Sequence, residues 1–266
     1  MSPYPIDLTM PLREGIAAYP SHGRSILGLS QVMKHSDFAG KGRFNPYDGA
    51  EVSFEVTQWL LGDQAGTHMD APFHTDPDSP YTIETLPLTY GWGPAVWIDC
   101  SADASGEGIS VAHLEAGLRR SGAELAPGDI LLLRTGASGI AVSDPGGYVL
   151  RAWGLTKEAG EWVRQQGVKT IGIDCVTIES ADTAARASVH TNLLRPAALG
   201  LEPTDVIAVI ENLVGIEKIP DHRFSFAGFP LPLAGAAGSP LRAVALPEMA
   251  SRLQGRPTLQ GTAISR

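Results

Sequence analysis

Three short apolar runs separated by two helical segments constrain the fold of this chain more than any other feature. The runs span 93–100, 128–136 and 168–175, and glycine or polar residues bound each of them. Apolar runs of this length are typical of buried strands. The segments between them, 109–122 and 155–167, combine apolar residues at helical spacing with a serine or threonine cap and a terminal glycine. The pattern predicts an α/β layered fold, although it does not fix the topology.

Further segments extend the same pattern over most of the chain. The runs 52–61, 205–213 and 240–246 read as additional strands. No linker or repeat interrupts them, so we expect a single domain over 1–250. The remainder, 251–266, is polar and aperiodic, and we expect a mobile end or an arm onto a partner subunit.

Composition narrows the class of protein. The chain has 266 residues, 43% hydrophobic and 18% charged, which is typical of a globular protein large enough for one sizeable core. A net charge of -9 argues against binding to nucleic acid. No apolar run is long enough to span a membrane, and the N-terminus lacks the pattern of a secretory signal. Cys100 and Cys175 do not have the spacing of a zinc site. In a protein of this size we expect two reduced thiols rather than a disulfide, and therefore a cytoplasmic location.

The stretch GDQAGTHMDAPFH, Gly62–His74, concentrates the residues with chemical potential. His68 and Asp70 are two positions apart, so on an extended segment their side chains lie on the same face. Gln64 and His74 share that parity. An imidazole and a carboxylate that converge suit Zn²⁺ or Mn²⁺. The same residues are also typical of a turn stabilised by side-chain hydrogen bonds, and the motif alone does not decide between the two.

Two residues far downstream are candidates to complete a metal site. Glu211 ends the apolar run VIAVIENL, where a buried carboxylate costs several kcal/mol unless it is paired or bound to metal. His190 lies in ASVHTNLL, and spacing alone does not show that it meets the motif. A serine nucleophile is disfavoured, because no Gly-x-Ser-x-Gly elbow is present, and no phosphate-binding glycine loop is present either.

These residues resemble a known family. The run GTHMDAPFH is similar to the His-x-Gly-Thr-His-x-Asp-x-Pro-x-His signature of the cyclase-like metal-dependent hydrolases, which include bacterial kynurenine formamidase and isatin hydrolase. The resemblance continues in IDLTMPLREGIAAYP, TIETLPLTYGWGPAVWIDCS, GDILLLRTG, GLTKEAGEWVRQQGVKTIGID, VHTNLL, VIENL and FPLPLAGAAGSPLRAVAL. It therefore covers nearly the whole chain except the tail.

The resemblance implies both a fold and an activity. The expected fold is a compact α/β domain whose mixed, barrel-like sheet is flanked by helices. The expected assembly is a homodimer or homotetramer, with a site that borrows residues across the interface. The expected reaction is hydrolysis of a carbon–nitrogen bond in a small amide, formamide or lactam, with one or two divalent ions, Zn²⁺ or Mn²⁺.

Site residues follow from the resemblance position by position. His68 and Asp70 match metal ligands of the motif, and His190 and Glu211 match the downstream ligands. Asp70 and Glu211 are the carboxylates able to bridge two ions. His74, the last histidine of the motif, matches the residue assigned to proton transfer.

Two positions depart from the family pattern. Gln64 replaces the first motif histidine, and its amide oxygen is a harder, weaker donor that suits Mn²⁺ better than Zn²⁺. We predict that Gln64 is a metal ligand, although full occupancy by two zinc ions is less expected. Tyr19 stands where the formamidases usually carry a tryptophan that contacts substrate, and Phe73 is a second candidate contact. Trp59 and Tyr81 are further candidates for a pocket wall, but core packing is favoured for Trp59, Phe73 and Tyr81.

Alternative functions share the same residues. A lactone or ester hydrolase, or a dehydrating cyclase, would use the same metal site and differ mainly in the leaving atom. A binding protein that kept the fold while Gln64 impaired catalysis is the third interpretation. The retention of His74 argues against it, because a binding protein has no need of a residue that transfers protons.

Overall fold

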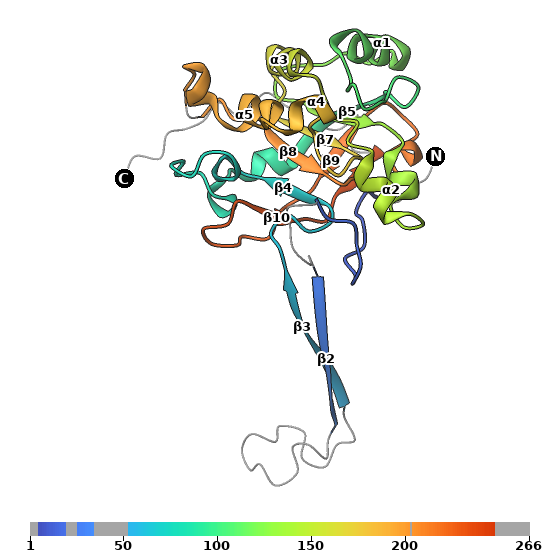
Figure 1. The fold of residues 1–266 in the computed structure, drawn as a ribbon, viewed down its shortest axis with the longest axis vertical. Helices are drawn as coiled ribbons and strands as arrows, with labels where there is room; N and C mark the ends of the chain where they lie inside the picture. The colour runs from blue at the N-terminus through green and yellow to red at the C-terminus, as the bar shows by residue number, and fades with distance from the viewer. Residues whose placement is uncertain (1–4, 20–25, 35–52, 203, 248–266) are drawn as a thin grey trace.

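The computed structural model describes residues 5–19, 26–34, 53–202 and 204–247. Figure 1 shows a body of sheet and helices, from which a ribbon of two strands extends. The ribbon consists of β2 (Ile26–Lys34) and β3 (Ser53–Leu61), paired antiparallel. The tail that we predict over 251–266 lies outside the described residues.

The body is built on one nine-stranded sheet. Its order is β1-β11-β9-β5-β6-β7-β8-β4-β10. The strands span, in that order, Ile6–Asp7, Val244–Leu246, Arg223–Ala227, Trp92–Asp99, Ile130–Arg134, Thr170–Ile173, Ala208–Glu211, His68–Asp70 and Gly238–Pro240. The four neighbours from β5 to β8 run parallel, and every other pair is antiparallel. The sheet is therefore mixed, as the family resemblance implies.

The helices are short and gather on one side of the sheet (Figure 1). They are α1 (Val111–Ser121), α2 (Pro145–Leu150), α3 (Lys157–Gln165), α4 (Ala181–Ala184) and α5 (Ser188–Leu194). Six turns of 3-10 helix complete the described part: η3 (Pro72–His74), η4 (Ile83–Thr85), η5 (Leu88–Gly91), η6 (Ala137–Ile140), η7 (Pro196–Leu199) and η8 (Ile216–Lys218). None of the described helices has the length and apolar character needed to cross a membrane.

Both faces of the central strands are buried, and this explains their continuous apolar runs. In β6, Leu131 and Leu133 pack under the helices, in a core that includes Leu114 of α1. Ile130 and Leu132 face the other side, in a second core inside the curl of the sheet. The three runs that we predict as buried strands are β5, β6 and β7, and all three are confirmed. The two predicted helices are confirmed as α1 and α3.

The last two strands show that the sheet closes on itself. Only Leu241–Ala243 separates β10, at one edge, from β11, next to the other edge. Four extended steps span at most about 14 Å, so the two edges must lie close together. The backbone N–H of Leu8 donates to the carbonyl of Ala243 at 2.9 Å. The barrel-like sheet is confirmed, whereas our prediction of one strand over 240–246 is wrong, because the chain crosses there from one edge to the other.

The predicted strand over 52–61 is confirmed as β3, but its environment differs from our expectation. Trp59 is 51% exposed and Leu60 is 72% exposed. Neighbouring side chains point to opposite faces of a strand, so neither face of the ribbon is covered at this point. The favoured prediction that Trp59 packs in the core is therefore wrong.

Candidate metal centre and active site

Strands β4 and β8 bring the motif together with its downstream glutamate. They pair antiparallel, with His68 opposite Glu211. Asp70 lies two residues further along β4, and therefore on the same face as His68. The Nε2 atom of His68 is 3.4 Å from Oδ1 of Asp70 and 3.6 Å from Oε2 of Glu211. The structure thus brings together three of the predicted ligands.

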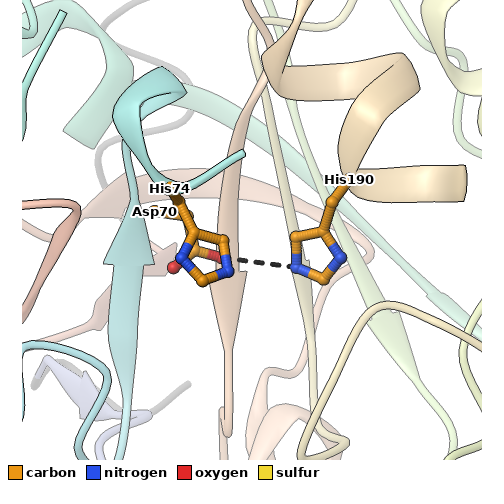
Figure 2. A group of neighbouring side chains, drawn as sticks. All are labelled: Asp70, His74 and His190. Carbon is orange, nitrogen blue, oxygen red and sulfur yellow. Dashed lines mark ion pairs between the residues drawn. The ribbon is translucent and has the colours of Figure 1, made fainter. Parts of the chain in front are cut away.

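His190 and His74 approach Asp70 from two other elements, and His190 also approaches Glu211. His190 belongs to α5, and its Nε2 is 3.2 Å from Oε1 of Glu211 and 3.7 Å from Oδ2 of Asp70. His74 ends η3, and its ring centroid is 5.5 Å from that of His190. Figure 2 shows the two imidazoles facing each other beside Asp70. One potential ligand atom each from Asp70, His74 and His190 lies within 4.8 Å of the others, and the same holds for His68, Asp70 and Glu211.

Hydrogen bonds at the outer nitrogens fix which ring atom of each histidine faces the centre. Nδ1 of His68 lies 2.8 Å from the carbonyl oxygen of Gly66, and Nδ1 of His190 lies 2.9 Å from Oε1 of Glu179. A carbonyl oxygen only accepts, so Nδ1 of His68 is the donor. Once the ring is neutral, its Nε2 carries the free lone pair. Both rings therefore present Nε2 to Asp70 and Glu211.

The loop before β4 packs closely against the N-terminal segment. Gly66 has φ of 62°, and a Cβ atom there would lie 2.6 Å from Cδ2 of Leu12. The next residue, Thr67, donates its hydroxyl to the carbonyl of Asn212 at 2.6 Å and accepts from the N–H of Met10 at 2.8 Å. Thr67 therefore joins the motif to the residue that follows Glu211.

Glu211 is held through the residue that follows it and through its own carboxylate. Asn212 has φ of 59°, a left-handed conformation that asparagine tolerates better than most residues. Its side-chain oxygen accepts from the Tyr148 hydroxyl at 2.9 Å. Oε1 of Glu211 itself accepts from the backbone N–H of Ile178 at 2.7 Å. These bonds orient the carboxylate before any ion binds.

Asp70 provides the test of whether these residues fit a metal ion. Its exposure is 0%, and neither carboxylate oxygen has a hydrogen-bond partner among the described residues. A buried carboxylate without hydrogen bonds costs several kcal/mol. A divalent cation among Asp70, His68 and Glu211 would remove that cost, and a mixture of imidazole and carboxylate suits Zn²⁺ or Mn²⁺. The donor set therefore fits a divalent metal.

The carboxylates also change the acid–base properties of the histidines. Burial acts to lower the pKa of His68, but Asp70 and Glu211 outweigh it and raise the pKa to about 9. Burial also acts to lower the pKa of His190, but the nearby carboxylates of Asp70, Glu179 and Glu211 outweigh it and raise the pKa well above its ordinary value. At Asp70, burial raises the pKa, but the charges of His68 and His74 hold it well below the ordinary range. An ion that binds here must displace protons from the imidazoles.

This proton displacement predicts opposite pH trends for folding and for metal binding. The pKa of His68 rises from 6.5 to about 9 on folding, so its contribution to stability is complete below pH 6.5 and is lost as pH rises through about 9. We expect the urea midpoint of the chelator-treated protein to fall over this window. Metal affinity should rise about tenfold per pH unit for each proton displaced. The fall in stability should be smaller in His68→Gln, and an identical trend in that variant would contradict the assignment.

A pocket of about 190 Å³ opens onto this centre. Six of the predicted site residues line it: Tyr19, Gln64, His68, His74, His190 and Glu211. Phe73, Tyr81 and Trp59 are not among its lining residues. Gln64 has its Nε2 atom buried without a partner among the described residues, and a Cβ atom at Gly238 would lie 2.5 Å from it. The roles assigned to Tyr19, Gln64 and Phe73 stay predictions.

Glu179 also lines the pocket, and our sequence analysis does not identify it. It is 3% exposed and bonds to His190. A weaker signal was present, because Glu179 directly follows Ile178 in the partly apolar stretch IDCVTIES, as Glu211 directly follows Ile210 in VIAVIENL. A carboxylate that closes a buried run needs an explanation at both positions.

Residues 6–180 match the family model described as "Putative cyclase". The chain belongs to the cyclase family. Kynurenine formamidase of Bacillus cytotoxicus is 29% identical over 242 residues, which cover 91% of this chain and 97% of the relative. An isatin hydrolase bound to the product analogue thioisatinate superposes with a TM-score of 0.70 at 21% identity, covering 91% of each chain. Isatin hydrolase A from Labrenzia aggregata, bound to benzyl benzoate, gives 0.70 at 20% identity, covering 91% of this chain and 93% of that one.

Proposed function

We propose that this cyclase-family protein is a metal-dependent hydrolase that cleaves the carbon–nitrogen bond of a small amide, formamide or lactam. The observation that carries the proposal is the convergence of His68, Asp70, His190 and Glu211, three of which, His68, His190 and Glu211, line one pocket. The similarity to kynurenine formamidase over most of both chains supports the same bond type. The buried carboxylate of Asp70, whose oxygens have no hydrogen-bond partner among the described residues, supports a cation at the centre.

In the proposed reaction, the four residues hold one or two divalent ions, and His74 moves the proton. A bound divalent ion would lower the pKa of a water molecule toward about 7 and would polarise the scissile carbonyl. His74 accepts a proton from the attacking water as the new carbon–oxygen bond forms. It then donates that proton to the leaving nitrogen as the carbon–nitrogen bond breaks, which yields a carboxylate and an amine.

The pocket supports a small substrate. Four of its lining residues are alanines, Ala17, Ala18, Ala184 and Ala187, and its volume is about 190 Å³. Tyr19 lines the same pocket at the position where the formamidases usually carry a tryptophan. We propose that Tyr19 contacts the substrate.

The test is a metal analysis followed by a substrate panel. Protein purified without chelator should contain Zn²⁺ or Mn²⁺, and one of these ions should support turnover of a formamide, amide or isatin-like lactam. Turnover of lactones or esters alone would favour the alternative hydrolase. A metal-loaded protein without turnover on any panel member would favour a binding protein, and a protein that takes up neither ion would end the metal proposal.

Gln64 decides how many zinc ions the centre accepts. We expect Gln64→His to raise zinc content toward two ions per chain, because an imidazole nitrogen suits Zn²⁺ better than an amide oxygen. Metal content after dialysis against limiting Zn²⁺ measures the change. Gln64→Ala is the control, because it removes the amide without adding an imidazole donor. A wild-type protein already saturated with two zinc ions would show that the amide is a sufficient ligand.

We propose a homodimer or homotetramer, supported by the ribbon of β2 and β3. An isolated two-stranded ribbon is marginally stable in water, and this one leaves Trp59 and Leu60 uncovered. The ribbon extends from the body, and a second copy of the chain that packs against it would cover these two side chains (Figure 1). Light scattering should report at least twice the chain mass of 28.1 kDa, and a monomer at micromolar concentration would contradict the proposal.

We also propose a cytoplasmic location, supported by the state of the two cysteines. Cys100 and Cys175 are both free and buried. Burial raises the pKa of Cys100 to about 12, so this thiol is protonated and unreactive at neutral pH. Reduced thiols of this kind suit a reducing compartment.

A further inference from the structure

The helix that carries His190 does not provide its own N-terminal cap. Helix α5 begins at Ser188 after Ala187, which has φ of 45° and no side-chain group able to accept a hydrogen bond. The first backbone N–H groups of any helix lack partners within the helix. Here a carboxylate from outside the helix is the acceptor for two of these groups. Oε1 of Glu179 accepts from the N–H of Val189 at 2.9 Å and from the N–H of His190 at 2.8 Å.

The same oxygen atom of Glu179 lies 2.9 Å from Nδ1 of the His190 ring. One carboxylate oxygen therefore receives two backbone donors and one side-chain donor from the first turn of α5. With Nδ1 engaged in this way, Nε2 of His190 faces Glu211 at 3.2 Å and Asp70 at 3.7 Å. The orientation of the ring and the start of the helix are thus set by a single group.

Glu179 is itself firmly placed. Its backbone carbonyl accepts a hydrogen bond from the N–H of Gly154 at 3.2 Å, and Glu179 forms an isolated parallel β-bridge with Leu155. A Cβ atom at Gly154 would lie 2.0 Å from the carbonyl oxygen of Ile178, so glycine is needed for the two segments to approach. Burial acts to raise the pKa of Glu179, but the hydrogen bonds from His190 outweigh it and lower the pKa below its ordinary value. The three donors on one oxygen place the carboxylate directly behind the His190 ring.

We propose that Glu179 is a positioning residue, which couples the capping of α5 to the placement of His190 Nε2 in the metal centre. The inference rests on the proposed function only in that the centre binds a divalent ion. A carboxylate behind a ligating histidine fixes the tautomer and raises the basicity of the nitrogen that binds metal. In this chain the same carboxylate also stabilises the helix that holds the histidine.

The opposite end of α5 provides a matched control. Arg164 of α3 donates from Nε to the carbonyl of Asn192 at 3.0 Å and from Nη2 to the carbonyl of Leu193 at 3.0 Å. Arg164 therefore stabilises the C-terminal end of the same helix. Its hydrogen bonds go to the backbone carbonyls of Asn192, Leu193 and Asp205, and not to the His190 ring. A variant at Arg164 weakens α5 without altering the partner of Nδ1.

The experiment compares Glu179→Ala, Glu179→Gln and Arg164→Met in three measurements. These are zinc affinity by chelator competition, the urea midpoint of the metal-free protein, and histidine ¹⁵N NMR of the zinc-loaded and metal-free forms. Glu179→Ala should lower zinc affinity by about 10- to 100-fold. Glu179→Gln, which keeps an acceptor oxygen but loses the charge, should lower affinity by less. Arg164→Met should lower the urea midpoint while zinc affinity stays at the wild-type value.

Each outcome separates positioning from simple helix stabilisation. An equal loss of zinc affinity in Arg164→Met would show that Glu179 acts only through helix stability, and would overturn the proposal. A proton on Nε2 rather than Nδ1 of His190 in the zinc-loaded wild type would overturn it as well. If the wild type binds no ion, the proposed function fails, but the role of Glu179 is still tested by NMR of the metal-free proteins. In these proteins the Nδ1 proton of His190 should exchange slowly in the wild type and in Arg164→Met, and rapidly in Glu179→Ala. Equal exchange in all three proteins would overturn the inference.

Discussion

Replacing Glu211 with glutamine is expected to remove most of the bound divalent metal. The two oxygens of Glu211 lie 3.2 Å from Nε2 of His190 and 3.6 Å from Nε2 of His68, so this carboxylate touches both halves of the centre. Glutamine has nearly the same shape but no charge, and among the described residues it leaves Asp70 as the carboxylate that still faces Nε2 of both His68 and His190. Loss of a partner behind a ligand costs about 10- to 100-fold in metal affinity, and we expect the loss of Glu211 to exceed about 100-fold.

The measurement is metal content by mass spectrometry after dialysis against a chelator of intermediate affinity. Glu217→Gln is the matched control, because Glu217 is a half-exposed glutamate on η8 whose partner is Arg134, 3.9 Å away. The control should retain the wild-type metal content. Unchanged occupancy in Glu211→Gln would remove Glu211 from the ligand set and leave its burial beside two histidines unexplained.

The parts of the fold and site that the sequence predicts correctly depend on local periodicity. β6 is buried on both faces, so its residues read as a continuous apolar run whatever their partners. His68 and Asp70 share a face because a strand has a period of two residues, and this holds before any neighbouring strand is known. The caps of α1 and α3 lie within three residues of the groups they satisfy.

The parts that could not be predicted depend on pairing between distant segments. His68 meets Glu211 only because β4 aligns with β8 in one register, and a shift by one residue would turn the glutamate to the other face. The 240–246 segment reads as one strand, since its apolar pattern does not show that its two ends pair at opposite edges of the sheet. Trp59 reads as a core residue, because exposure depends on which layer covers β3 and not on the residue type.

Glu179 is a different case, because it is a buried carboxylate like Glu211 but is not among the predicted site residues. The cost of burying a carboxylate draws attention to Glu211, and the same cost applies to Glu179. The outcome differs, because Glu211 faces the centre while Glu179 binds the outer nitrogen of His190. Our sequence analysis identifies only Glu211 as a carboxylate that requires a partner, and the structure shows that Glu179 requires one too and which partner each carboxylate has.

Substitution of His74 has the second large expected effect, and the result distinguishes a metal ligand from a residue that transfers protons. The geometry allows a ligand role, because His74 offers an atom within 4.8 Å of atoms from Asp70 and His190. The position also suits proton transfer, because His74 is half-buried at the end of η3 and lines the pocket. We favour proton transfer, since His68, Asp70, His190 and Glu211 already supply enough donors for one ion.

The prediction is that His74→Ala retains its metal and loses about 10²- to 10⁴-fold in kcat, the usual range for a general acid–base group. Metal content and turnover are measured on the same preparation, with the substrate that the panel identifies. His222→Ala is the control, because His222 stacks on Trp97, with ring centroids 4.2 Å apart, and does not line the pocket. Added imidazole should restore part of the activity of His74→Ala, because a small base can occupy the space that the ring leaves. A parallel loss of metal and turnover, without rescue, would instead make His74 a ligand, and the second group of Asp70, His74 and His190 would then be a site for a second ion.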